Sequence, residues 1–313
     1  MVLVLALTAC GTAPPRPTFV TPSGGPSPTA STAATSPAPP RGPVVIPPGV
    51  TAGIAVFDRQ TGSFVEQRNI SMQFRSASLV KLLIALDYLW DRGPTYDMPT
   101  ADRDRLTIML RSSDDGAATY YWRGSGRGQI VLRMKDRLDL PDAGPPPASR
   151  PNAWGYTALS AGDLVRVYRY LLDEAPAPVR DFVLGKLRES TRCGTDDFDQ
   201  SFGIPSAFDR PWAVKQGWSG FGDIPAKRCT GGYVRASFVE PGFARTAPDF
   251  VGEVLHTTGT VGADDRAIVA VLTVHKDGTS FAKATAALST LVRSLPVPGA
   301  TATETGTATT TAG

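Results

Sequence analysis

The most informative stretch of the chain is residues 78–90, which read SLVKLLIALDYLW. Leucines recur through it at helical spacing, so it predicts a helix. Ser78 and Lys81 stand three residues apart at its start, which places the hydroxyl and the ammonium on one face. A serine hydroxyl becomes a strong nucleophile only when a base removes its proton. The pair predicts a nucleophile with its proton acceptor, although a helix cap beside a surface lysine would give the same pattern.

Two later groups follow in the chain. Ser113-Asp114-Asp115 lies between two predicted helices, and Lys215-Gln216-Gly217 closes a predicted strand. Together with Ser78-x-x-Lys81 they resemble the ordered motifs Ser-x-x-Lys, Ser-Asp-Asn and Lys-Thr-Gly of class A β-lactamases and penicillin-binding proteins. The resemblance covers most of residues 50–296. The sequences around the second and third motifs, SSDDGAA and AVKQGW, resemble those of a mycobacterial alanine-rich lipoprotein group.

The resemblance implies three catalytic residues. Ser78 would be acylated, and Lys81 would accept or relay its proton. Ser113 would pass a proton to the leaving nitrogen.

The same resemblance implies residues that line the substrate cleft. Lys215 would attract a substrate carboxylate, and Gln216 would offer an amide donor in place of the family's threonine. Gly217 would leave the strand edge open to the acyl group. The backbone N–H of Trp218 would complete an oxyanion hole with that of Ser78.

Two departures from the family bear on activity. Asp115 stands where the family has asparagine, so it would favour the charged form of Lys81 and repel an anionic substrate. The region 140–156, which corresponds to the loop that carries the deacylating glutamate in class A enzymes, contains Asp142 as its only acid and no glutamate. We therefore do not expect efficient β-lactamase action.

The order of the predicted elements indicates the fold. Strands are expected first, helices fill the middle, and strands with one closing helix end the domain. The predicted strands are 51–58, 63–68, 212–217, 250–258 and 267–275. The predicted helices are 78–90, 101–111, 115–121, 128–138, 160–172, 179–189 and 281–295. This order predicts an α/β (α+β) fold of the β-lactamase/transpeptidase type. Both chain ends build an antiparallel sheet flanked by helices, and the middle forms an all-helical lobe.

The chain start reads MVLVLALTAC, and its last four residues resemble a bacterial lipobox. Residues 1–10 are interpreted as a lipoprotein signal peptide with Cys10 as the lipidated residue, although the expected positive start is missing. An apolar segment followed by an ordinary cysteine is the alternative. Residues 11–48 predict a disordered Pro/Thr/Ser/Ala tether, 49–296 the folded domain and 297–313 a disordered tail. The protein would be lipid-anchored on the extracytoplasmic face of the cell membrane.

The composition narrows the ligands. The net charge of +3 without a basic run argues against nucleic acid, and two histidines with three cysteines leave few ligands for a metal. No metal or cofactor is expected. Cys193 and Cys229 would form a disulfide in an exported protein or remain two separate thiols, and the sequence leaves both open.

These observations favour a cell-envelope serine acyltransferase or hydrolase that works through an acyl-Ser78 intermediate. A peptidoglycan stem peptide, or a related amide or ester, would be its substrate. The alternative is a non-catalytic cell-wall-binding lipoprotein that kept the fold and lost the chemistry.

Overall fold

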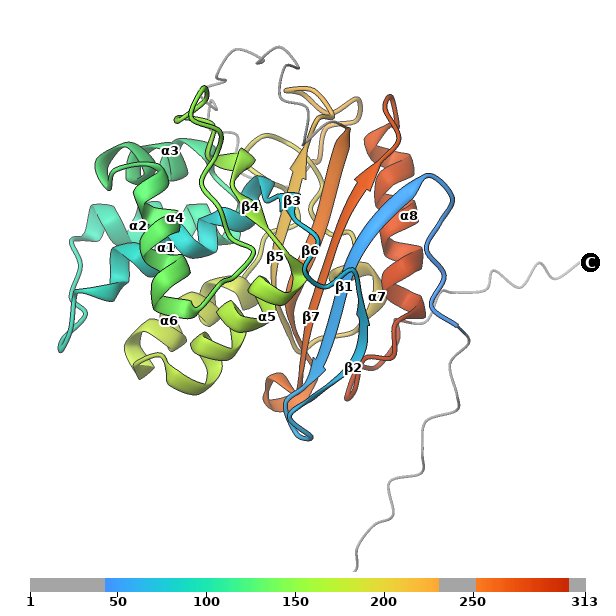
Figure 1. Ribbon diagram of the computed structural model, residues 1–313, viewed down its shortest axis with the longest axis horizontal. Coiled ribbons are helices and arrows are strands. Elements are labelled where there is room, and N and C mark those ends of the chain that lie inside the picture. Colours follow the sequence, from blue (N-terminus) through green and yellow to red (C-terminus); the bar gives the residue numbers. More distant parts are fainter. Residues whose placement is uncertain (1–42, 231–251, 304–313) are drawn as a thin grey trace, which may run out of the picture. The chain divides into compact units, whose positions relative to one another are not determined.

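The protein is described by a computed structural model over residues 43–230 and 252–303. Its main sheet has five antiparallel strands in the order β2-β1-β7-β6-β5 (Figure 1). Their bounds are β1 Val50–Asp58, β2 Ser63–Arg68, β5 Trp212–Ser219, β6 Glu253–Val261 and β7 Ala267–His275. The central strands β6 and β7 are rich in β-branched residues and almost completely buried, because helices cover both faces of the sheet.

The helices form two unequal groups around this sheet (Figure 1). One face carries α1 Val80–Trp90, α2 Thr100–Arg111, α3 Asp115–Gly124, α4 Gly128–Leu138, α5 Ala161–Arg169 and α6 Ala177–Arg188. The other face carries α7 Ile204–Ala207 and α8 Phe281–Ser294. Alternate residues of a strand point to opposite faces of the sheet. In β7, Ile268 therefore packs in the core beneath the first group of helices and Val269 in the core beneath the second. The expected antiparallel sheet with a helical lobe is confirmed.

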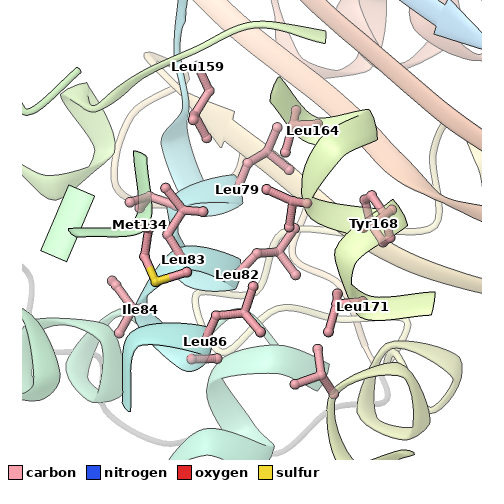
Figure 2. Packing of buried hydrophobic residues seen from close by; sticks show 14 of the residues in the cluster. Leu79, Leu82, Leu83, Ile84, Leu86, Met134, Leu159, Leu164, Tyr168 and Leu171 are labelled. Carbon is pink, nitrogen blue, oxygen red and sulfur yellow. The ribbon is translucent and has the colours of Figure 1, made fainter. Parts of the chain in front are cut away.

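Helix α1 lies at the centre of the helical lobe. Its apolar residues pack on all sides against other helices and the short strand β4 Ala158–Leu159 (Figure 2). A helix that is apolar all round is a core helix, and burial of this surface contributes much of the lobe's stability. A 3₁₀ turn over Ala77–Leu79 leads into α1. The first turn of the helix is thereby fixed against the sheet.

The structure differs from the sequence expectations at short elements. Strand β3 Phe74–Arg75 pairs with β4, and neither was predicted, nor was α7. Each is too short to show a period.

The folded domain also extends beyond both expected boundaries. Val44 and Ile46, placed in the tether, pack against the cluster under α8. Val297 is buried, and Ala302 pairs with Phe208, although both were placed in the loose tail. The bridge between Phe208 and Ala302 is made by backbone groups, which every residue type carries. The amino-acid composition of the tail therefore gives no indication of it. Cys10 lies outside the described residues, as do the whole of the expected signal peptide, residues 11–42 of the tether and residues 304–313 of the tail.

Across residues 43–230 and 252–303, none of the helices combines the length and the apolar character that crossing a bilayer requires.

Candidate active site

Ser78 lies in the 3₁₀ turn at the start of α1, where its side chain is almost completely buried. The residue before it, Ala77, has a φ of 46°, a left-handed conformation that costs a residue with a Cβ about 1–2 kcal/mol. Strained backbone of this kind concentrates at functional sites. The packing around the turn holds Ala77 in this conformation: Ser76 N–H donates to Thr157 O at 2.7 Å, and β5 runs close beside the turn.

Gly217 makes that close approach possible. A Cβ at this position would lie 3.1 Å from Ser76 O and 3.2 Å from Leu79 Cγ. The glycine is thus required for packing β5 against the turn that carries Ser78. The sequence predicted a glycine here to leave room for an acyl group. The contacts of the turn with β5 are a further reason why a side chain does not fit at this position.

Four predicted residues meet at one point. Lys81 Nζ lies 2.8 Å from Ser78 Oγ and 3.2 Å from Ser113 Oγ. Lys215 Nζ lies 2.8 Å from the same Ser113 Oγ. Ser113 therefore bridges the two lysines, which come from α1 and β5. Residues from the helical lobe and from the sheet are brought together, as the three motifs predict.

Asp115 joins this cluster at the first residue of α3. Its Oδ1 lies 2.6 Å from Lys81 Nζ, and the ion pair joins a fully buried lysine to a carboxylate side chain that is 52% exposed. The ring of Trp154 lies on another side of Lys81, with its centroid 4.8 Å from Nζ. A carboxylate and an aromatic face both stabilise an ammonium. Segment 140–156 thus brings an aromatic ring, rather than a carboxylate, against Lys81.

Lys215 has different surroundings. Its side chain is buried, and within the described residues no carboxylate lies at ion-pair distance from its Nζ. Among the described residues, its amine donates hydrogen bonds to Ser113 Oγ and, at 3.3 Å, to the Gln216 carbonyl. Burial and then the neighbouring Lys81 ammonium lower the pKa of Lys215 well below its ordinary value, while Asp115 and Asp196 oppose the shift. Of the two lysines, Lys215 is the one whose surroundings favour a neutral amine.

Gln216 does not serve the cleft as expected. Its amide donates to Gln200 O at 3.1 Å and to Phe202 O at 2.6 Å. Neighbouring residues of a strand point to opposite faces, so Gln216 faces away from the side on which Lys215 meets Ser113. This corrects the expectation that its amide would bind a substrate carboxylate.

Trp218 leads to a site residue that the sequence reasoning missed. Its indole N–H donates to Asp196 Oδ2 at 2.9 Å. Burial, followed by the charge of Asp115, raises the pKa of Asp196 to about 6, and the Lys81 charge partly offsets this. Asp196 therefore belongs to the same electrostatic cluster. Asp196 lies in a turn and belongs to none of the three motifs, so its position three residues after Cys193 was the only indication in the sequence.

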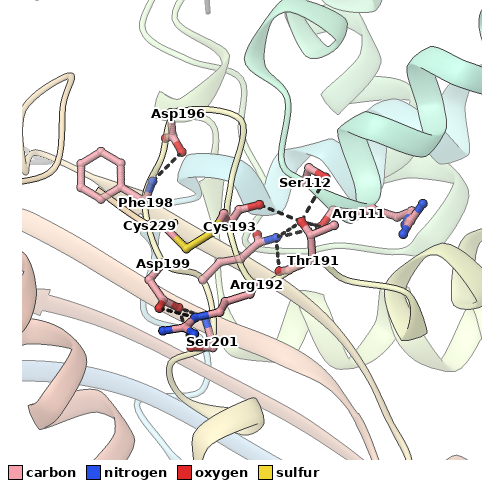
Figure 3. The surroundings of a disulfide bond; sticks show 11 residues. Arg111, Ser112, Thr191, Arg192, Cys193, Asp196, Phe198, Asp199, Ser201 and Cys229 are labelled. Atoms are coloured by element: carbon pink, nitrogen blue, oxygen red, sulfur yellow. Dashed lines mark hydrogen bonds and ion pairs between the residues drawn. A yellow bond between two sulfur atoms is a disulfide. The ribbon is translucent and has the colours of Figure 1, made fainter. Parts of the chain in front are cut away.

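A disulfide joins Cys193 to Cys229 and closes the loop that carries Asp196 (Figure 3). The loop also holds the Ser113 turn, because Thr195 N–H donates to Ser112 O at 2.9 Å. Thr191, just before the loop, adds a second contact, since its hydroxyl donates to Ser112 Oγ at 3.0 Å. Ser113 itself has a φ of 58°. Of the two possibilities for the cysteines, the structure contains the disulfide, and it lies where it supports the site.

Among the described residues, no group of three or more His, Cys, Asp or Glu side chains is arranged to hold a metal ion.

A five-stranded antiparallel sheet, a helical lobe and a Ser-Lys-Ser-Lys cluster between them define the fold of the serine β-lactamases and penicillin-binding proteins. Solved structures agree with this assignment. A class A β-lactamase from Mycobacterium abscessus superposes with a TM-score of 0.54 at 16% identity, covering 79% of this chain and 92% of its own. PBP-A superposes with a TM-score of 0.55 at 13% identity, covering 80% of this chain and 90% of its own. At such identities the likeness establishes the fold alone.

In sequence the chain is similar to a protein of Mycobacterium tuberculosis and Mycobacterium bovis named "Putative lipoprotein LppW". The two are 38% identical over 175 residues, which are 54% of this chain and 54% of the relative. The chain thus aligns with about half the length of the curated relatives it matches. No family model matches the chain.

Proposed function

We propose that the protein is a cell-envelope serine acyltransferase or hydrolase that works through an acyl-Ser78 intermediate. One observation carries the proposal: Ser78 Oγ lies 2.8 Å from the amine of Lys81, and Ser113 links that amine to a second lysine. A nucleophile within hydrogen-bond reach of a base that a third group orients is the arrangement that activates serine.

The reaction would proceed in two steps. In the first, Ser78 Oγ forms a bond to the acyl carbon, the bond from that carbon to the leaving group breaks, and the Ser78 proton passes through Lys81 and Ser113 to the leaving atom. The backbone N–H groups of Ser78 and Trp218 would stabilise the oxyanion. In the second, water or an acceptor amine forms a bond to the acyl carbon, the bond from that carbon to Ser78 Oγ breaks, and a proton of the attacking group passes to Ser78 Oγ.

A peptidoglycan stem peptide, or a related amide or ester, is the proposed substrate class. The charges of the site argue against rapid reaction with β-lactams. The Asp115 ion pair compensates the charge of Lys81, and Asp196 adds a second carboxylate, so an anionic ligand gains little attraction. Slow formation and slow hydrolysis of a penicilloyl adduct are both expected. Reaction with penicillin is known within this fold, since a mutant of PBP-A forms an acyl-enzyme complex with penicillin G.

Attachment to the cell membrane through lipidated Cys10 completes the proposal. The lipobox-like end of MVLVLALTAC and the similarity to LppW support it. Growth with labelled palmitate should label the wild-type protein and leave Cys10→Ala unlabelled. Equal labelling would reject Cys10 as the anchor.

The activity is tested with a panel of N-acyl amino-acid esters, thioesters and amides. We expect turnover of at least one class by the wild-type protein and none above background by Ser78→Ala. Equal rates for the two proteins would reject the proposal.

A non-catalytic cell-wall-binding lipoprotein is the second candidate, and the ion pair between Lys81 and Asp115 favours it, because an ammonium cannot act as a base. It predicts saturable binding of cell-wall fragments that Ser78→Ala leaves unchanged.

A further inference from the structure

We propose that a second binding site lies at one end of the sheet, away from Ser78, and takes a small zwitterion: an amino acid or a short peptide with free amino and carboxyl groups. The site is a cavity of about 510 Å³ between two β turns and the end of α5. One guanidinium and one carboxylate of its lining have no ionic partner among the described residues. Binding there would not depend on the acyl-Ser78 chemistry.

Three segments that are far apart in the sequence form the walls of the cavity. They are the β1–β2 turn (59–62), the β6–β7 turn (262–266) and the π-helical turn Tyr170–Glu174 together with the end of α5 before it. The two β turns lie side by side at one end of the sheet (Figure 1), where Arg59 N–H donates to Arg266 O at 2.9 Å. π-Helical turns are rare and occur often at functional sites. The walls therefore meet only in the folded protein.

The cavity is separate from the Ser78 site. Lys215, which meets Ser113, pairs with Thr258 on β6, and β6 continues to Val261 before the β6–β7 turn begins. At about 3.4 Å per residue, the turn begins roughly 10 Å farther along the strand. None of the residues that line the cavity belongs to the Ser-Lys-Ser-Lys cluster. A ligand in the cavity would therefore not occupy the site of Ser78.

Two arginines of the lining are already held by carboxylates. The Arg59 guanidinium donates to Asp173 Oδ1 at 2.8 Å and to the Asp264 carbonyl oxygen at 2.8 Å. One guanidinium thus joins the π-helical turn to the β6–β7 turn. The Arg266 guanidinium lies 3.3 Å from Oδ2 of Asp58, which is buried. Walls that are fixed before binding lose less conformational freedom when a ligand enters.

Two other charged groups of the lining are not paired in this way. Arg169, the last residue of α5, lies over the ring of Phe57, with its Cζ 5.2 Å from the ring centroid. Asp264 is exposed in the β6–β7 turn, where its φ is 55°. Within residues 43–230 and 252–303, neither side chain has a partner of opposite charge. The cavity therefore offers a ligand one positive and one negative group, from two different walls.

These two groups favour a zwitterion over a simple anion. An anion attracted by Arg169 would also face the carboxylates of Asp173 and Asp264, which repel it. A zwitterion avoids this repulsion, because its carboxylate can bind Arg169 through paired N–H groups while its ammonium binds Asp264. The Gln60 amide also lines the cavity and can both donate to and accept from a peptide bond.

The size of the cavity suits such a ligand. Its volume of about 510 Å³ lies within the range of about 300–1,000 Å³ that is typical of small-molecule sites. A single amino acid or a peptide of a few residues would fit, and the experiment distinguishes the two.

The test is a titration of the Ser78→Ala protein with trialanine, followed by amide ¹H–¹⁵N NMR, so that no reaction at Ser78 interferes. We expect saturable shifts with a Kd on the order of 1 mM. N-acetyl-trialanine lacks the ammonium and trialanine amide lacks the carboxylate. Each should bind about fivefold more weakly, which is the effect of one exposed ion pair. Alanine that binds as tightly as trialanine would identify an amino acid as the ligand, and weaker binding of alanine would identify a peptide.

Two conservative variants in the same background assign the contacts. Arg169→Gln should bind trialanine and its amide equally weakly, because the partner of the carboxylate is lost. Asp264→Asn, which tolerates the left-handed φ, should bind trialanine and its N-acetyl form equally weakly. The matched controls are Arg166→Gln on the exposed side of α5 and Asp104→Asn on the exposed side of α2. Both controls should bind trialanine as the parent protein does.

No saturation up to about 10 mM trialanine would overturn the proposed site, as would equal affinity for the free and the blocked peptides. Shifts confined to residues around Ser78, and unchanged in Arg169→Gln and Asp264→Asn, would place the peptide in the catalytic site and overturn it as well. Both variants alter exposed side chains, so their unfolding temperatures should match that of the parent protein. This control separates loss of binding from loss of folding. Failure of trialanine to bind would leave the acyl-Ser78 proposal standing, and failure of Ser78 to be acylated would leave this site standing.

Discussion

Asp115 Oδ1 lies 2.6 Å from Lys81 Nζ, so the amine beside the candidate nucleophile is paired with a carboxylate in the resting site. In the resembling families an asparagine occupies the corresponding motif position, and an amide leaves the lysine uncompensated. One side chain therefore links the reactivity of Ser78 to the charge of the whole cleft. Acylation rates with an anionic penicillin and with an uncharged ester separate these two effects.

Asp115→Asn should speed the reaction with penicillins. The substitution frees Lys81 and removes a negative charge that repels the penicillin carboxylate, so we expect adducts to form about tenfold faster, corresponding to about 1.4 kcal/mol. The rate of the mass increase is measured, with Asp104→Asn on the exposed face of α2 as the control. A slower reaction than wild type would show that the carboxylate assists acylation.

Asp196 should make the site sensitive to pH for anionic ligands. Its pKa is raised to about 6, so the carboxyl is ionised above this value and neutral below it. The penicillin rate divided by the p-nitrophenyl acetate rate should therefore rise as the pH falls from about 7.5 to about 5, because the ratio cancels changes in the nucleophile. Asp196→Asn should give a flatter ratio. The same slope in both proteins would place Asp196 outside the ligand's electrostatic range.

Removal of the disulfide should destabilise the fold and the Ser113 turn. The disulfide joins residues 36 positions apart. Loss of a cross-link that closes a loop of this size lowers the free energy of unfolding by about 4 kcal/mol, because the unfolded chain gains conformational entropy. Urea unfolding of the Cys193→Ser/Cys229→Ser variant measures the loss in unfolding free energy. Adduct formation under native conditions should slow as well. Wild-type stability in this variant would show that the loop is held by its hydrogen bonds alone.

His256 should make the fold sensitive to acid. Burial lowers the pKa of His256 from 6.5 to about 4. Its Nδ1 accepts a hydrogen bond from Thr273 N–H, and its Nε2–H donates to Arg75 O, close to the Ser78 turn. Between pH 6.5 and pH 4 the imidazole of His256 is protonated in the unfolded chain and neutral in the folded protein. The contribution of His256 to the free energy of unfolding is therefore fully present above pH 6.5 and is lost as the pH falls toward 4. From about pH 7.5 to pH 5 the unfolding free energy should drop by about 2 kcal/mol through this group.

His256→Gln tests this effect, because the glutamine amide can replace both hydrogen bonds without titrating. Its loss of unfolding free energy from about pH 7.5 to pH 5 should be about 2 kcal/mol smaller than that of wild type. His275→Gln, at the end of β7, should retain the larger part of the loss. Equal losses in wild type and His256→Gln would show that the acid sensitivity arises elsewhere.

The sequence predicted the long elements and the motif residues well, because each has a local signal. Apolar spacing locates α1, and the order of the three motifs brings Ser78, Lys81, Ser113 and Lys215 into one site. What it missed depends on tertiary contacts. Asp196 reaches the site through a loop and a disulfide, and the face on which Gln216 lies follows from the sheet.

The measurement that tests the central claim most directly is the intact mass of the protein after incubation with a reactive penicillin. The wild-type protein should gain one penicillin mass slowly and keep it, because deacylation lacks the family's glutamate, and Ser78→Ala should gain nothing. An adduct of equal yield on Ser78→Ala, or none on wild type even with p-nitrophenyl acetate as the second probe, would contradict a live Ser78 nucleophile.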